Sequence, residues 1–242
     1  MEKLRIKDSM LYFFRSDGWF VKFLAIVGLI FVPIIGWVAI MGYFLRIAKR
    51  WLDEEYEGLP DFSEFGSLIA SGFFLLIVMI LYSLPQFLFA FIPCLGNLLY
   101  TAYGIVLALI MPYIICTIAT EGTISGNVFA FGEIVKFVQE NIINLLIFYL
   151  VELGIGIVSA ILFVPFIAGG AILISIGEGA KYIVPALISF AIAAIIFLIV
   201  GIWSSSVSYA LSGNVFGIWQ RKKSFVSKQP PIEEPTATNP IQ

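Results

Sequence analysis

Histidine is absent from this sequence of 242 residues, and cysteine occurs only at Cys94 and Cys116. These absences exclude zinc sites built from cysteine and histidine, and every mechanism that needs a catalytic histidine. Both cysteines fall inside one apolar run, which favours a role as small buried residues. We therefore expect no metal site and no cofactor.

Charged residues are also scarce. Only 12% of the residues are charged and 60% are hydrophobic, whereas a soluble domain has about 25% charged residues. Residues 65–120 contain no Asp, Glu, Lys or Arg. One membrane span needs about 20 apolar residues, so this run holds two. The composition indicates a polytopic membrane protein, and the net charge of −2 gives no indication of nucleic-acid binding.

Five hydrophobic tracts cover residues 19–45, 68–91, 95–119, 142–167 and 183–209. Each must be helical in lipid, because the bilayer offers no water to unpaired backbone groups. The expected fold is an all-α, polytopic transmembrane helical bundle with five or six membrane-penetrating helices. Residues 1–220 would form this single domain, with the glycine-rich stretch 168–181 as a short surface or re-entrant connection. The polar, proline-rich residues 221–242 would form a disordered tail.

The basic residues predict an orientation. If the second to fifth tracts all cross, the loops 46–66 and 120–141 and the C-terminal tail share one side of the membrane. Eight Lys or Arg residues then lie on that side, against Lys181 alone on the other. By the positive-inside rule that side is cytoplasmic. The eight are Arg46, Lys49, Arg50, Lys136, Arg221, Lys222, Lys223 and Lys228.

The first tract, residues 19–45, has two interpretations. A single tilted span kinked at Pro33 would place the five basic residues of the N-terminus outside. A helical hairpin with legs at 10–32 and 34–52 would keep the N-terminus cytoplasmic and raise the tally to thirteen against one. Pro33 supplies a place to turn, because it removes a helical hydrogen bond. The hairpin could enter the membrane only part-way.

The most charged stretch, RIAKRWLDEEYEGLPDFSEFG at 46–66, follows the first tract. Residues 43–56 have helical amphipathicity, with predicted pairs Lys49–Asp53 and Arg50–Glu54 at i,i+4. We expect an amphipathic helix on the cytoplasmic membrane face, with aromatic residues at the headgroups and a capping box at 61–64. The alternative is a docking surface for a protein partner. Its candidate residues are Arg46, Lys49, Arg50, Trp51, Asp53 and Glu54, and the candidate headgroup aromatics are Trp51 and Tyr56.

The pattern GYFLRIAKR…GLPDFSEFGSLIASGF resembles the domain of unknown function 4013 family of archaeal and bacterial membrane proteins. The resemblance is closest over residues 18–90 and looser as far as Gln220. It implies an integral membrane protein and brings no activity with it. The matching residues are Pro33, Gly42, Tyr43, Arg46, Leu59, Pro60, Phe62, Phe65, Gly66 and Gly72.

Glu152 is the only ionisable residue deep inside any tract. A charge at the bilayer centre costs about 2.5–3.5 kcal/mol, so its side chain should face protein or a wet cavity. It is either a proton or cation site or a neutral acid bonded to a neighbouring helix. The serines of the fifth tract would line a pathway or let helices pack closely. Candidate partners are Tyr103, Gln86, Ser204, Ser205, Ser206 and Ser208.

Two functional classes remain. The first is a non-catalytic scaffold, shaping or assembly component; the second is a small-solute or ion transporter using Glu152. An enzyme is not expected, because the chain has neither a glycine-rich phosphate loop nor a nucleophile–base pair. The pentapeptide SGNVF occurs at 125–129 and 212–216, which leaves an internal repeat open. The lipid bilayer is the expected partner, and a homo-oligomer is open.

Overall fold

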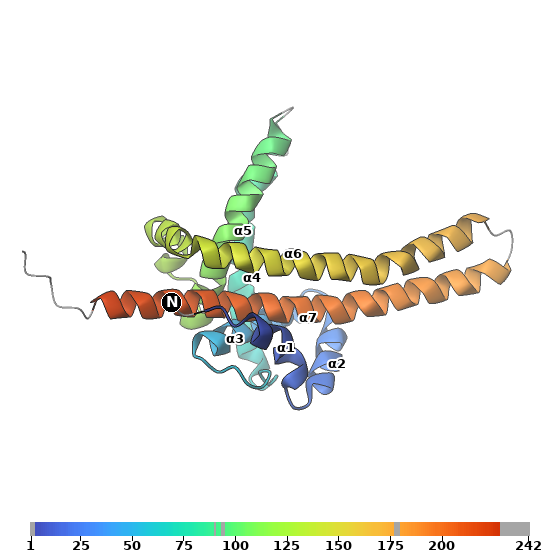
Figure 1. Ribbon diagram of the computed structural model, residues 1–242, viewed down its shortest axis with the longest axis horizontal. Helices are drawn as coiled ribbons and strands as arrows, with labels where there is room; N and C mark the ends of the chain where they lie inside the picture. Colours follow the sequence, from blue (N-terminus) through green and yellow to red (C-terminus); the bar gives the residue numbers. More distant parts are fainter. Residues whose placement is uncertain (1–2, 90, 93–94, 177–179, 228–242) are drawn as a thin grey trace, which may run out of the picture.

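A computed structural model describes residues 3–89, 91–92, 95–176 and 180–227 (Figure 1). These residues form helices and loops, so the all-α prediction is confirmed. The helices in chain order are α1 (Ile6–Arg15), α2 (Trp19–Ile30), α3 (Ile35–Leu52), α4 (Phe65–Phe89), α5 (Gly96–Glu121), the 3₁₀ helix η1 (Gly126–Phe129), α6 (Phe131–Ile176) and α7 (Ala180–Ser227).

Four of these helices, α4 to α7, are long and apolar enough to cross a membrane. They form two antiparallel hairpins, α4–α5 and α6–α7, which Figure 1 shows leaving a common base in different directions. The apolar part of α6 from residue 142 to 176 is about 52 Å long, against a hydrocarbon core of about 30 Å. An upright span would exceed that thickness, so a membrane crossing by α6 and α7 requires a tilt.

The base is the region in which α3 packs against α4, α5 and α7, so α3 lies at its centre. Glycines permit the close approach. A Cβ atom at Gly42 would lie 1.9 Å from the carbonyl oxygen of Leu68, and one at Gly72 would lie 1.9 Å from that of Val38. On the other side of α3, a Cβ at Gly213 would lie 2.3 Å from the carbonyl oxygen of Ala48. The backbones of three helices are thus nearly in contact.

The first tract is a helical hairpin and not one kinked span. Helix α2 ends at Ile30, the chain turns through residues 31–34 with Ile34 at φ 65°, and α3 begins at Ile35. The indole Nε1 of Trp37 donates to the carbonyl oxygen of Ile30 across this turn at 3.0 Å. The predicted first leg, 10–32, is wrong in one respect. It is broken at residues 16–18, where Gly18 takes φ 66°, so that α1 and α2 are separate helices.

Part of the predicted connection 168–181 and part of the predicted disordered tail are helical instead. Residues 168–176, expected as a surface or re-entrant piece, continue α6, because glycines in lipid still satisfy their backbone bonds best in a helix. Helix α7 runs to Ser227, past the expected start of the disordered tail at 221; residues 228–242 lie outside the described residues. The two SGNVF copies differ in conformation, one being η1 and the other lying within α7.

The charged segments meet at one end of the molecule, here called the polar end. Arg221 of α7 pairs with Glu54 at 2.7 Å, and Lys223 pairs with Glu133 of α6 at 2.7 Å. The N-terminal segment joins them, since the backbone N–H of Arg5 donates to Oδ1 of Asn214 at 3.1 Å. The loops that were expected on one side of the membrane, because the second to fifth tracts all cross, are therefore neighbours. The N-terminal segment lies with them.

Candidate functional site

Residues 53–64, which join α3 to α4 and are here called the clasp loop, are held by Arg46. Its guanidinium donates to the carbonyl oxygen of Ser63 at 2.8 Å and to that of Asp61 at 3.3 Å. It also pairs with the Glu64 carboxylate at 3.0 Å and donates to the hydroxyl of Ser67. The fork of donors on arginine suits such a cluster of acceptors. Arg46 therefore fixes the path of the chain between two helices.

Lys22 holds the same loop from α2. Its ammonium group donates to the carbonyl oxygen of Leu59 at 2.6 Å and pairs with Asp61 at 2.9 Å. The hydroxyl of Ser16 accepts from the backbone N–H of Leu59 at 2.7 Å. The two ends of the first tract thus meet at one loop, which is what a hairpin requires. Lys22 and Ser16 carried no site prediction, because their partners lie about 40 positions away in the sequence.

The apolar face of the predicted interfacial helix is buried in the protein core. Trp51 is fully buried and packs edge-on against Tyr12 and Tyr56, with ring centroids 5.5 and 5.0 Å apart. The Tyr12 hydroxyl donates to the carbonyl oxygen of Gly58 at 2.7 Å, and burial raises the pKa of Tyr12 to about 12. The prediction of Trp51 at the headgroups is wrong, because α1 and α7 cover the apolar face of α3 before lipid can.

The predicted ion pairs also differ. Arg50 pairs with Glu55 at 3.1 Å, and Glu54 pairs with Arg221 at 2.7 Å, in place of the predicted Arg50–Glu54 pair. The expected capping box at 61–64 does not start the next helix, because α4 begins only at Phe65. Of the six candidate partner residues, Arg46, Arg50 and Trp51 face the protein. Only three remain exposed: Lys49, Asp53 and Glu54.

The Lys22–Asp61 pair predicts a pH dependence. The hydrogen bond and the charge of Lys22 hold the pKa of Asp61 below its ordinary value. The pair therefore stabilises the fold above the unfolded pKa of about 3.9, and that contribution is lost as the pH falls through the lower folded pKa. Because the Asp61 side chain is 75% exposed, the contribution should be below about 1 kcal/mol. The unfolding free energies of wild type and Asp61→Asn should differ at pH 7 and converge below about pH 4; a difference independent of pH would contradict this assignment.

Glu152 lies on α6, and its carboxyl group lies near the hydroxyl of Ser208 on α7. Its Oε1 atom is buried and has no hydrogen-bond partner within the described residues. Tyr103, another predicted partner, instead donates to the carbonyl oxygen of Tyr82 at 2.7 Å. Gln86 lies beside Gly104. Gln86 and Tyr103 therefore both belong to the α4–α5 hairpin and not to the Glu152 site.

The serines of α7 mostly bond to their own helix. Ser205 donates to the carbonyl oxygen of Gly201 at 2.8 Å, and Ser206 donates to that of Ile202 at 2.9 Å. Ser204 is half-buried. A hydroxyl bonded four residues back presents little polarity to a neighbour, which favours close packing over a lined pathway. Of the candidate serines, the structure brings Ser208 to Glu152.

Five hollows in the described residues lie at the polar end, and Glu152 lines none of these five. One of about 290 Å³ is bordered by Arg46, Lys49 and Glu64. Another, of about 790 Å³, lies between the start of α6 and the end of α7. The described part of the chain holds no group of three or more His, Cys, Asp or Glu side chains that could bind a metal ion.

A family model described as protein of unknown function (DUF4013) matches residues 25–168. The chain belongs to this family. The predicted resemblance is confirmed, and the match extends from α2 into α6. No curated protein and no solved structure matches the chain.

The residues that carried the family resemblance build the base and the clasp. Gly42 and Gly72 form the crossing of α3 and α4, and Arg46 ties the clasp loop. The rings of Tyr43 and Phe62 stack with centroids 4.6 Å apart. In this chain the residues of the pattern therefore hold α3, α4 and the clasp loop together. The family description adds no activity to this role.

Proposed function

We propose that this membrane protein is a non-catalytic component that shapes the bilayer by inserting the α2–α3 hairpin into the cytoplasmic leaflet. The observation that carries the proposal is the apolar tip of that hairpin, here called the wedge (residues 31–37). Phe31 is 77% exposed and Ile34 is 71% exposed, and Val32, Ile35 and Trp37 are exposed beside them. So many large apolar side chains at one tip favour contact with lipid.

The length of the hairpin limits its depth. Lys22 and Arg46 both bind the clasp loop, so they mark the polar level at which the two legs begin. From Lys22 to the end of α2 is about 12 Å, and from Arg46 back to the start of α3 is about 16 Å. The hydrocarbon core is about 30 Å thick, so the wedge would reach about its middle. Material inserted into one leaflet expands that leaflet alone.

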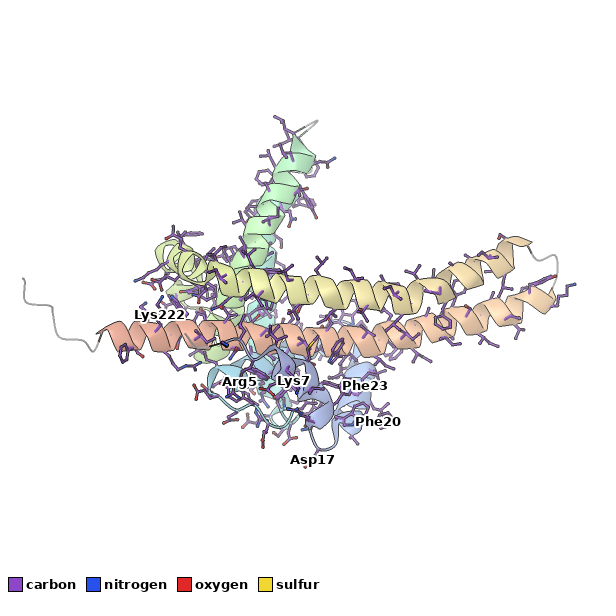
Figure 2. The ribbon with its side chains drawn as sticks, in the orientation of Figure 1. Arg5, Lys7, Asp17, Phe20, Phe23 and Lys222 are labelled. Atoms are coloured by element: carbon purple, nitrogen blue, oxygen red, sulfur yellow. The ribbon has the colours of Figure 1, made fainter. Side chains whose placement is uncertain are left out.

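Figure 2 shows Phe20 and Phe23 on α2, far from Lys222 near the C-terminal end of α7. The basic residues of the N-terminus lie with the clasp loop, as the cation–π contact of Arg5 with Tyr56 illustrates at 4.1 Å. The sequence count of thirteen Lys and Arg residues against one favours a cytoplasmic polar end in the cell membrane.

Removing apolar bulk from the wedge should abolish the effect on membrane shape. The double variant Phe31→Ser/Ile35→Ser removes two exposed side chains, each contributing about 2 kcal/mol of insertion free energy. Wild type reconstituted at rising protein-to-lipid ratio should give smaller vesicles or tubules by electron microscopy. The double variant should leave vesicle diameters as in protein-free samples.

Phe131→Ser/Val135→Ser is the matched control, because it removes two exposed apolar side chains with the same four-residue spacing in the sequence, but at the polar end and not in the wedge. This control should remodel vesicles like wild type. Remodelling by the wedge variant at the wild-type level would overturn the proposal.

Transport is the second candidate, favoured by the buried, unpartnered Oε1 of Glu152. If the carboxyl group serves helix packing, proteoliposomes should show no more proton or cation flux than protein-free vesicles. Glu152→Gln should then leave vesicle remodelling unchanged, since the amide has nearly the same size and stays beside Ser208. Flux that wild type supports and Glu152→Gln abolishes would instead establish the transporter.

We further propose that a protein partner at 46–66 would contact the exposed Lys49 of α3 and the outer surface of the clasp loop. In that loop Asp53, Glu54, Glu55 and Glu57 are exposed. This acidic surface favours a basic partner.

A further inference from the structure

We propose that the hollow between α6 and α7 at the polar end, here called the α6–α7 hollow, binds one anionic phospholipid. Its volume is about 790 Å³. This inference goes beyond the proposed function and holds whether or not the wedge bends the bilayer. The residues that carry it are Ile142, Ile143 and Asn144 of α6, and Ile218, Arg221 and Lys222 of α7.

The charge of the hollow fits a phosphate group. Arg221 and Lys222 are adjacent on α7, and Lys222 is exposed. Glu140 also lines the hollow, but its Oε2 accepts a hydrogen bond from Nε1 of Trp219 at 3.0 Å. Arg221 also pairs with Glu54 at 2.7 Å, so Lys222 is the cation more available to a ligand. Arg221 and Lys222 bring two positive charges beside the carboxylates of Glu140 and Glu54, so the exposed Lys222 carries the attraction to a phosphate group.

The apolar lining fits an acyl chain. Ile143 is 70% exposed and Ile142 is exposed beside it. From residue 142 to the end of α6 the only charged residue is Glu152, so the hollow lies where the apolar part of the hairpin begins. This boundary is the headgroup level, where basic pockets between transmembrane helices bind anionic lipids. Asn144 adds amide donors at the same level.

A soluble phosphate compound or a peptide fits less well. Small-molecule pockets are typically about 300–1,000 Å³, so the volume suits a headgroup with the first part of its chains. A free phosphate would leave the isoleucine side chains in contact with water. A lipid satisfies the cations and the apolar surface together.

Native mass spectrometry of the full chain in a mild detergent, titrated with phosphatidylglycerol or phosphatidylcholine, tests the proposal. Wild type should bind phosphatidylglycerol in preference to phosphatidylcholine, with one tight adduct. Lys222→Gln should weaken the phosphatidylglycerol adduct about fivefold, and Lys222→Arg should restore it. Ile143→Ser, which alters only the apolar lining, should weaken both lipids.

Lys136→Gln is the control, because this exposed lysine of α6 does not line the hollow. It should bind like wild type. Glycerol 3-phosphate should not displace the lipid. Equal binding of the two lipids, equal losses in Lys136→Gln and Lys222→Gln, or displacement by glycerol 3-phosphate would each overturn the proposal.

Discussion

Alanine at position 42 or 72 should prevent α3 and α4 from packing, and each substitution should destabilise the protein by about 3 kcal/mol or more. The added Cβ would lie 1.9 Å from a backbone carbonyl oxygen, either that of Leu68 or that of Val38. Carbon–oxygen contacts need about 3.3 Å, so the helices must separate by more than about 1 Å. Backbone cannot rotate away as a side chain can, and the whole base would be forced to shift.

Titration with sodium dodecyl sulfate, followed by tryptophan fluorescence, measures this loss, since Trp51 is buried in the base. Gly154→Ala is the control. Gly154 lies in α6 with nothing within 4 Å of an added Cβ, so alanine should leave stability unchanged or raise it slightly. Wild-type stability in both Gly42→Ala and Gly72→Ala would show that the two helices do not cross at these glycines.

Loss of Arg46 should have the second largest effect. Arg46→Ala leaves the carbonyl oxygens of Asp61 and Ser63 without their donor and the Glu64 carboxylate without its ion pair. Hydrogen bonds to a charged group contribute about 1.5–3 kcal/mol. Because the Arg46 side chain is 24% exposed, a loss of about 2 kcal/mol is expected from the same titration.

A second readout separates the clasp from general stability. Limited proteolysis should cut residues 53–64 of Arg46→Ala at least several times faster than those of wild type. Arg46→Lys should be intermediate, because an ammonium group lacks the fork of donors. Lys49→Ala removes an exposed charge from the same helix and should change stability by less than about 0.5 kcal/mol. Equal effects of Arg46→Ala and Lys49→Ala would contradict the clasp.

The apolar segments were predictable from the sequence because their signal is compositional. Uncharged runs such as residues 65–120 have no alternative to helices in lipid. The number of crossings grouped the loops on one side, and the Lys and Arg counts predicted that this side is cytoplasmic. The turn near Pro33 was predictable for the same local reason, since proline cannot continue a helix. The hairpin interpretation of the first tract followed from adding charge to that local signal.

The clasp could not be predicted from local pattern. An amphipathic stripe on residues 43–56 shows that one face is buried, but not whether lipid or protein covers it. The covering elements, α1 and α7, are remote in sequence, and so are the partners of Lys22 and Arg221. Charged residues close in sequence suggested i,i+4 pairs, whereas Arg50 pairs with Glu55, one position further along, and Glu54 pairs with the remote Arg221.

The most direct test of the central claim, that the first tract returns to the side from which it starts, is cysteine accessibility in intact cells. Lys3→Cys and Glu55→Cys would each be treated with a membrane-impermeant maleimide before and after permeabilisation, with the labelling of the parent chain subtracted. We predict that both sites stay unlabelled until the cells are permeabilised, and that both then react. Labelling of Lys3→Cys from outside intact cells, with Glu55→Cys still protected, would show a single span and contradict the hairpin.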